Sequence, residues 1–196
     1  ANDLSVGGNI TAEGDILLDG SFIRYDSVGG PGYWHEHDLP ATSFSKGASG
    51  ATEVAPDANT LGGWQLNANT EYLYTEVHGE DDIVAASAGR LIVTFEVNVD
   101  NTGGLTSDVV VFDTECYRKV LGETVNTVHT HSGSTVVGQA GVGKLFKQEI
   151  TLHDIDVDQT TAIRLSLDTA GSDVDDVILV LVEFAYKTFY PAEEVD

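Results

Sequence analysis

The chain has 196 residues, 41% of them hydrophobic, and its 32 acidic and 9 basic side chains give a formal net charge of -23. This length and apolar content suit one domain with a buried core plus an appendage. Nucleic acid is excluded as a partner because phosphate recognition needs clustered cations, and only Arg118 and Lys119 are adjacent. No apolar run of about 18 residues occurs, so no membrane partner is expected. The single cysteine, Cys116, excludes an intrachain disulfide and lies in a strand-like segment.

The acidity indicates a hypersaline setting. Repulsion among so many carboxylates strains a compact domain in dilute buffer, whereas molar salt shortens the screening length to roughly 3 Å and removes most of that repulsion. The excess of acid over a sparse basic complement, with Asp more frequent than Glu, resembles the composition of haloarchaeal proteins. A merely acidic surface is the alternative. No basic and apolar leader opens the chain, which predicts synthesis in the host cytoplasm.

Residues 1–25 predict an N-terminal attachment and oligomerisation arm. From Val6 to Gly20, short apolar groups alternate with Gly, Asn and Asp turns, and so few apolar residues cannot enclose a core of their own. We therefore expect the arm to pack against neighbouring copies or another protein. The contact residues expected in it are Ile10, Ile16, Leu17, Leu18 and Phe22.

Residues 26–69 predict a loop-rich connecting region, because Gly, Ser, Ala and Asn are frequent there. Residues 70–196 predict an all-β domain, an antiparallel β-sandwich that is jelly-roll-like rather than immunoglobulin-like. The segment from Leu91 to Val99 alternates apolar and polar residues, as a strand with one buried and one solvent face does. Strands are expected near residues 71–78, 90–99, 109–120, 124–131, 144–152, 162–168 and 177–189.

Three features of this pattern resemble the jelly-roll domains of head fibres and decoration proteins of tailed phages and archaeal tailed viruses. They are Trp64, the alternating strand from Leu91 to Val99, and the apolar ending from Asp175 to Tyr186. The segment from Gly8 to Ile16 is likewise similar to the attachment segments of phage fibre proteins. Together with the acidity, the resemblance implies a structural protein on the virion surface of a haloarchaeal virus: a homotrimeric capsid decoration, spike, turret or head-fibre protein. Its implied partners are its own copies and the major capsid protein or another virion protein.

Two His-x-His pairs are candidate ligands of a transition metal. On a strand, His35 with His37, and His129 with His131, would each present two imidazoles on one face. Neither pair has a third ligand nearby in the sequence. Three pairs meeting on a trimer axis would supply six nitrogens to one axial ion, an arrangement that resembles trimeric phage tips. The alternatives are a polar loop for the first pair and the solvent face of an edge strand for the second.

Two groups of aspartates are candidate calcium ligands, because carboxylate oxygens are hard donors and the loops at one end of a sandwich can bring them together. Neither group matches an EF-hand loop, and solvated loop acidity is the alternative. The candidate residues are Asp154, Asp156, Asp158, Asp173, Asp175 and Asp176.

The sequence contains no nucleophile elbow and no phosphate loop, so no enzymatic activity is expected. Besides the virion role, two functions stay open. One is a receptor-binding fibre head that recognises host surface glycans, and the other is a cellular carbohydrate-binding or calcium-binding β-sandwich module. For glycan recognition the expected stacking residues are Tyr33, Trp34 and Trp64, whose alternative role is core or interface packing.

The charge yields a direct prediction. If carboxylate repulsion is the main strain, the melting temperature rises steadily between dilute buffer and molar KCl, by about 2–4 °C for each 1 kcal/mol of repulsion that salt screens. Calorimetry across the salt series measures this rise. Equal stability in dilute buffer would contradict the hypersaline interpretation.

Overall fold

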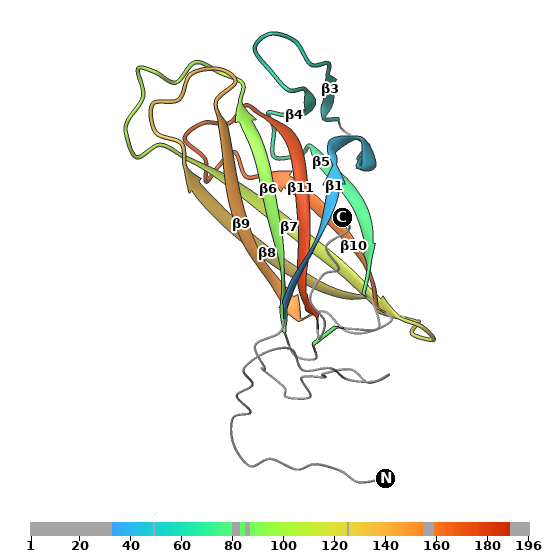
Figure 1. Cartoon of the computed structure of the whole chain (residues 1–196). Coiled ribbons are helices and arrows are strands. Elements are labelled where there is room, and N and C mark those ends of the chain that lie inside the picture. The colour runs from blue at the N-terminus through green and yellow to red at the C-terminus, as the bar shows by residue number, and fades with distance from the viewer. Residues whose placement is uncertain are drawn as a thin grey trace, which may run out of the picture.

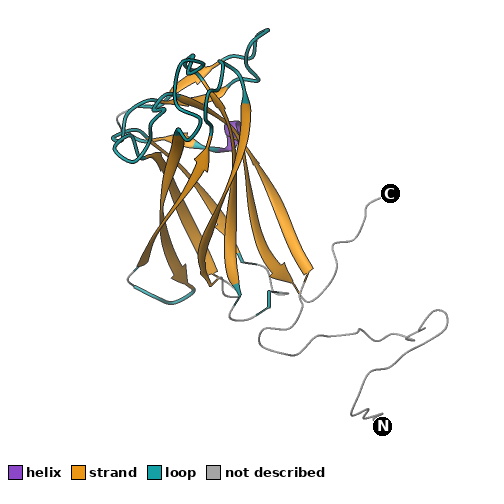
Figure 2. Cartoon of the chain, turned by 90° about the vertical axis from the view of Figure 1, so that its left-hand side faces the viewer, coloured by secondary structure: helices purple, strands orange, loops and turns teal. Residues whose placement is uncertain are grey.

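The structure is a computed structural model that describes residues 33–48, 50–79, 83–84, 87–124, 126–154 and 159–188. Within them the chain forms two antiparallel sheets that face each other as a sandwich (Figures 1 and 2). The expected all-β sandwich is therefore confirmed, whereas the expected N-terminal arm lies outside the described residues. No helix among the described residues has the length and apolar character needed to cross a membrane.

The first sheet has six strands, with the long strand β11 at its centre. Along one edge β11 pairs with β6, and along the other it pairs with β1 and with β4. The strands of this sheet are β1 (Tyr33–Pro40), β3 (Thr52–Val54), β4 (Gly63–Leu66), β6 (Ala88–Val97), β9 (Leu145–Asp154) and β11 (Val177–Thr188).

The second sheet has five strands in the order β2-β5-β10-β7-β8. Its strands are β2 (Ser45–Lys46), β5 (Tyr72–His78), β7 (Val109–Val120), β8 (Thr127–Val136) and β10 (Gln159–Leu167). The main strands of the first sheet thus lie in the order β4-β11-β6-β9, and those of the second in the order β5-β10-β7-β8. From β4 onward, consecutive strands lie in opposite sheets, except for β7 and β8, which are neighbours in the same sheet. This order is that of a jelly roll.

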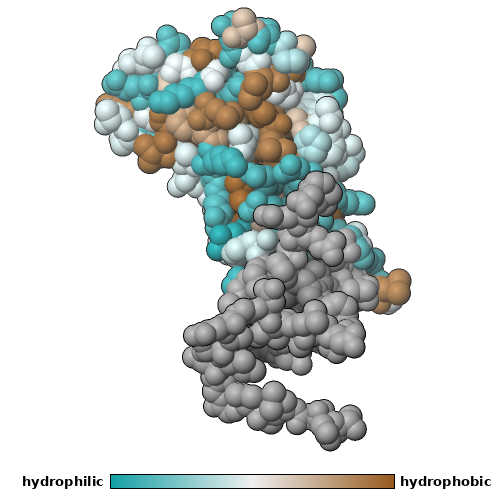
Figure 3. All heavy atoms as spheres, viewed as in Figure 1, coloured by the Kyte–Doolittle hydropathy of each residue, from teal (hydrophilic) through white to brown (hydrophobic). Residues whose placement is uncertain are grey.

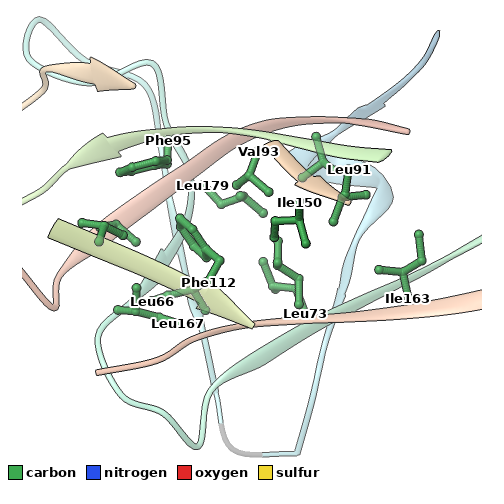
Figure 4. Close-up of a cluster of buried hydrophobic side chains, with 14 of the residues drawn as sticks. Leu66, Leu73, Leu91, Val93, Phe95, Phe112, Ile150, Ile163, Leu167 and Leu179 are labelled. Atoms are coloured by element: carbon green, nitrogen blue, oxygen red, sulfur yellow. The ribbon is translucent and has the colours of Figure 1, made fainter. Parts of the chain in front are cut away.

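Alternating side chains from both sheets fill the space between them (Figure 4). Phe95 on β6 meets Phe112 on β7 edge to face, with ring centroids 5.1 Å apart, and Phe146 on β9 stacks on Phe95 at 5.8 Å. Leu91, Val93, Phe95 and Val97 are fully buried, as the alternation predicts. This burial of large apolar side chains is the main stabilising contribution to the sandwich.

The other face of β6 differs from the expected solvent face, because Thr94 and Glu96 are also buried. The loop between β3 and β4 covers this end of the strand. The Glu96 carboxylate accepts hydrogen bonds from the Thr60 hydroxyl at 2.6 Å and from the Leu61 backbone N–H at 3.0 Å. The buried Glu96 carboxylate therefore fixes the β3–β4 loop against β6 through these hydrogen bonds.

The region 26–69 contributes more to the sandwich than its composition predicts. From Tyr33 onward it supplies β1, β2, β3, β4 and a short 3-10 helix, η1 (Ala41–Ser43). Strand β1 is rich in polar residues, which is why its composition resembles a loop. All eight of its residues nevertheless pair with β11. The sandwich therefore begins before residue 70.

Exposed apolar side chains gather at the loop end of the sandwich, the upper part of the surface in Figure 3. Backbone hydrogen bonds tie the loop after β6 to the loop after β8, including Asn101 N–H to the Ala140 carbonyl at 2.9 Å. The exposed apolar residues of these loops, of the β3–β4 loop and of the first position of β9 are Leu61, Val99, Leu105, Val142 and Leu145. Backbone hydrogen bonds thus hold the loops of this end together, although several of their side chains are exposed and apolar.

Candidate functional site

A groove runs along β10 on the outer face of the five-stranded sheet. Its floor consists of the small side chains of Thr160 and Ala162. Strand β5 forms one wall with Glu76 and His78, and strand β7 forms the other with Tyr117 and Lys119; the loop after β7 closes one end. The two walls are separated by two strand spacings, roughly 10 Å, and the groove has a volume of about 560 Å³.

A charged group lies next to this groove on the same strand. Arg164 of β10 donates a hydrogen bond to Glu115 of β7 at 2.9 Å, and the Tyr117 hydroxyl donates to the same carboxylate oxygen at 2.5 Å. This hydrogen bond to Glu115 raises the pKa of the Tyr117 hydroxyl. Arg164 and Glu115 are both partly exposed. The face therefore offers donors and acceptors that protein contacts hold in fixed positions.

Two further tyrosines stand beside Arg164. The Arg164 guanidinium lies over the Tyr72 ring, 3.9 Å from its centroid, while Tyr74 directly opposite Arg164 on β5 is 45% exposed. Tyr72 also requires a glycine beneath it, because a Cβ at Gly47 would lie 2.2 Å from its ring. We name the set of Tyr72, Tyr74, Tyr117, Glu115 and Arg164 the tyrosine face.

A second hollow continues the face toward the β8 edge. It has a volume of about 320 Å³ and lies between Asp113 and Glu115 on β7 and Thr130 and Ser132 on β8. Burial raises the pKa of the Asp113 carboxyl, and the nearby charges of Asp168 and Glu115 raise it further. Polar side chains capable of accepting or donating hydrogen bonds thus extend across three strands.

The tyrosine face was missed in the sequence, which favoured Tyr33, Trp34 and Trp64 for stacking. Trp34 lies on the outer face of the other sheet, where the Arg90 guanidinium covers its ring at 3.8 Å. Trp64 is half-buried against the core and donates its indole N–H to the Ala41 carbonyl at 2.7 Å. Tyr33 begins β1, opposite Thr188. The missed signal was the period-two spacing of Tyr72 and Tyr74, which places both on one strand face.

The first His-x-His pair faces the space between the sheets. His35 and His37 lie on β1, their rings stacked 4.5 Å apart, and both stack on Tyr186 of β11. His37 Nε2 lies 3.1 Å from the Tyr186 hydroxyl oxygen. The pair therefore belongs to a strand rather than to the polar loop that was its alternative.

The second pair also faces inward, and residues distant in sequence complete it. His129 and His131 on β8 meet His153 at the end of β9, and the buried Cys116 on β7 lies directly opposite His129. Ligand atoms of Cys116, His131 and His153 all lie within 4.8 Å of one another. The fold thus brings two potential ligands from β7 and β9 next to His131, although neither is close to the pair in sequence, and His129 is outside this group of three.

Burial favours the uncharged forms of Cys116, His131 and His153. It lowers the pKa of His153 to about 4, with the nearby positive charges of His129, Arg118 and His131 acting in the same direction and Gln159 opposing them. Burial followed by the His129 charge lowers the pKa of His131. Burial also raises the pKa of the Cys116 thiol to about 12. Neutral imidazoles are the form that binds metal ions.

The described members of the two aspartate groups lie at opposite ends of the sandwich. Asp154 ends β9 opposite Ala88, whereas Asp176 precedes β11 beside Asn98 at the far end of β6. Asp176 accepts hydrogen bonds from the amides of Gln65 and Asn98, and Asp173 accepts one from the Val109 backbone N–H. Among the described residues, no three carboxylates come within metal-ligand distance of one another. Asp156, Asp158 and the arm residues Ile10, Ile16, Leu17, Leu18 and Phe22 lie outside the described residues.

Comparison with known proteins finds no matching family model and no matching curated protein. Among solved structures, the CBM36-1 domain of a multidomain xylanase from the hindgut metagenome of Trinervitermes trinervoides is similar with a TM-score of 0.48 at 13% identity, covering 76% of this chain and 96% of that one. A carbohydrate-binding module CBM36 in complex with calcium and xylotriose is similar with a TM-score of 0.46 at 15% identity, covering 76% and 98%. The xylan-binding module CBM15 is similar with a TM-score of 0.45 at 8% identity, covering 81% and 99%. At this level the similarity concerns the arrangement of strands and assigns no ligand to this chain.

The crowding around Asp113 yields a prediction about stability. Because the folded-state pKa is raised above the unfolded value, ionisation of Asp113 costs folding free energy at every pH above that pKa, and the cost disappears as the carboxyl is protonated below about pH 4. Asp113→Asn should therefore raise the free energy of unfolding at pH 7 by up to about 1 kcal/mol, because solvent screens a charge that is only half-buried. Urea unfolding at pH 7 and pH 3 measures the difference.

Asp175→Asn is the matched control, since it removes the same formal charge from an exposed loop. Molar KCl should shrink the gain from Asp113→Asn because salt screens the repulsion. A gain that persists unchanged at pH 3 would show that the carboxylate charge is not its cause.

Proposed function

We propose that this β-sandwich is a non-catalytic glycan-binding module that holds an extended oligosaccharide along β10 on the tyrosine face. The observation that carries the proposal is the grouping of three tyrosines around the Arg164–Glu115 pair on an open sheet face. The proposal rests on this face and not on the overall likeness to sugar-binding modules.

Tyrosine rings suit the apolar faces of sugar rings. A pyranose presents C–H groups on its faces and hydroxyls at its rim, so an aromatic ring binds its face while polar side chains bind the rim. Tyr74 on β5 lies opposite Arg164 of β10. Tyr117 on β7 lies opposite Ala162, two residues before Arg164 and on the same face of the sheet. Tyr117 lines the groove there, and the small side chain of Ala162 leaves room for a ligand.

The polar groups match the same class of ligand. Glu115 and Asp113 accept hydrogen bonds, while Arg164 and Lys119 donate them, and sugar hydroxyls do both. Because Arg164 is held by Glu115 and by the Tyr72 ring, little side-chain entropy is lost when a ligand binds. We propose a neutral oligosaccharide, since the face combines both signs of charge without a cationic excess.

Substitution of the stacking residues tests this proposal. Tyr74→Ala and Tyr117→Ala should each weaken binding by about 3- to 10-fold, the loss expected for one aromatic contact. A glycan array identifies the oligosaccharide, and calorimetry with it measures each variant.

Trp34→Ala is the control, because it removes a partly buried aromatic ring from the outer face of the other sheet. Loss of binding in Trp34→Ala but not in the tyrosine variants would place the glycan on the other sheet. Absence of any bound glycan on the array would overturn the proposal.

A role on a virion surface is a second proposal, supported by the segment from Val6 to Gly20 and by the acidity. The arm would attach the sandwich to coat subunits by apolar burial, at roughly 25 cal/mol per Å², and trimer formation would multiply its effective concentration. A glycan-binding sandwich carried by such an arm is a receptor-binding head, so the two proposals are compatible.

Deletion of residues 1–22 tests the arm. The truncated chain should keep its oligomeric state and its melting temperature but fail to join particles, because the contacts with the coat are lost. Light scattering and the protein content of purified particles measure the two effects. Leu121→Ala, which removes an exposed apolar side chain from the β7–β8 hairpin, is the control and should be incorporated normally. Undiminished incorporation of the truncated chain would refute the arm's role.

A further inference from the structure

One edge of the sandwich contains a buried polar group that neither proposal above uses. Strands β8 and β9, the edge strands of the two sheets, lie side by side there. His129 and His131 point inward from β8, His153 comes from β9, and Cys116 lies behind them on β7. Most of the remaining interior is apolar, so this group needs a physical explanation.

A bulge in β9 aims His153 into the group. Between the pairs Arg90↔Thr151 and Ala88↔Asp154, β9 has two residues, Leu152 and His153, where β6 has only Gly89. The extra residue breaks the alternation, so that Leu152 and His153 in succession are buried or half-buried. Bulges of this kind re-aim side chains near functional sites.

Three ring nitrogens of the group, on His129 and His153, lack the hydrogen-bond partners that buried polar atoms normally have. The rings of His129 and His153 stack 4.3 Å apart at 13°, and no hydrogen bond of normal geometry from a described residue reaches Nε2 of His129 or either ring nitrogen of His153. These atoms are shielded from solvent. Unsatisfied buried polar atoms are rare and costly, so three in one small group indicate a ligand.

We propose that Cys116, His131 and His153 bind a borderline divalent transition metal of the zinc class. The thiolate and two imidazoles form the mixed sulfur and nitrogen set that such ions prefer over hard cations such as calcium. In a tetrahedral site with ordinary bond lengths, ligand atoms lie about 3.3–3.7 Å apart, so the three atoms, now within 4.8 Å, must converge by about an ångström. His129 holds the His153 ring by stacking and lies beside the fourth position.

Binding requires two changes that the contacts make clear. His131 Nε2 accepts the His153 backbone N–H at 3.2 Å, so a metal bound at that nitrogen replaces this hydrogen bond. The Cys116 thiol loses its proton to solvent, and the cation compensates the resulting buried thiolate charge. The occupied site would link β7 and β8 of one sheet to β9 of the other, and it should therefore raise the melting temperature.

The test uses the full chain without a polyhistidine tag, stripped with chelator, reduced, and titrated anaerobically with Co²⁺ in 1 M KCl. High salt suppresses adventitious binding to the acidic surface. We expect one Co²⁺ per chain, with visible bands of a tetrahedral ion and a near-ultraviolet band of sulfur-to-cobalt charge transfer. Zn²⁺ should displace the Co²⁺ and raise the melting temperature.

Three variants assign the ligands. Cys116→Ser should lose the sulfur band, and His153→Gln should bind at least tenfold more weakly, with circular dichroism confirming that each is folded. Replacing His35 and His37 with Gln is the matched control, because it removes the other His-x-His pair and should leave the titration unchanged. If a variant does not fold, the wild-type stoichiometry and sulfur band decide alone. The proposal would be overturned if the wild-type chain did not bind one Co²⁺ per chain or showed no sulfur-to-cobalt band. It would also be overturned if the His35 and His37 variant lost both the binding and the band.

Discussion

Strict side-chain alternation along β7 is the constraint on which both candidate sites depend. Successive residues of a strand point to opposite faces, and β7 lies in the interior of its sheet with neighbours on both edges. Inward, it gives Phe112 to the apolar core and Cys116 to the histidine group. Outward, it gives Glu115 and Tyr117 to the tyrosine face. A shift of one residue in register would exchange these sets, burying a carboxylate and exposing the core. The register that stabilises the core therefore also fixes both sites.

The interior changes character along the sandwich. At the loop end, Phe95, Phe112 and Phe146 pack against one another between the sheets, and backbone hydrogen bonds connect the loops of that end. Near the beginning of β8 and the end of β9, histidines replace these apolar residues. Packed imidazoles with unsatisfied ring nitrogens, such as those of His129 and His153, contribute less stability than leucine or phenylalanine in the same volume. This exchange of stability for donor atoms is typical of a functional site.

Local pattern predicted the strands well and the sites poorly, for physical reasons. The limits of β7 agree with the structure at both ends, because its alternation is strong and turn residues flank it. Strand β1 was missed because its polar residues reflect an edge position beside β11, which local sequence does not encode. His153 and Cys116 join the His129 pair only through the sheet topology and a bulge. Glu115 and Tyr117 approach Arg164 through the pairing of β7 with β10, which is distant in sequence.

The charge of -23 constrains which kinds of recognition can operate in this chain. In salt strong enough to screen such a charge, attraction between exposed ions vanishes within about 3 Å, so steering by opposite charge cannot select a partner. Stacking of a neutral sugar on tyrosine, and coordination of a metal by sulfur and nitrogen, act at contact and depend little on ionic strength. Both candidate sites use interactions of this kind. The Arg164–Glu115 pair then positions groups rather than attracting a ligand from a distance, and Tyr72 stacking fixes the guanidinium under conditions in which the ion pair alone would be weak.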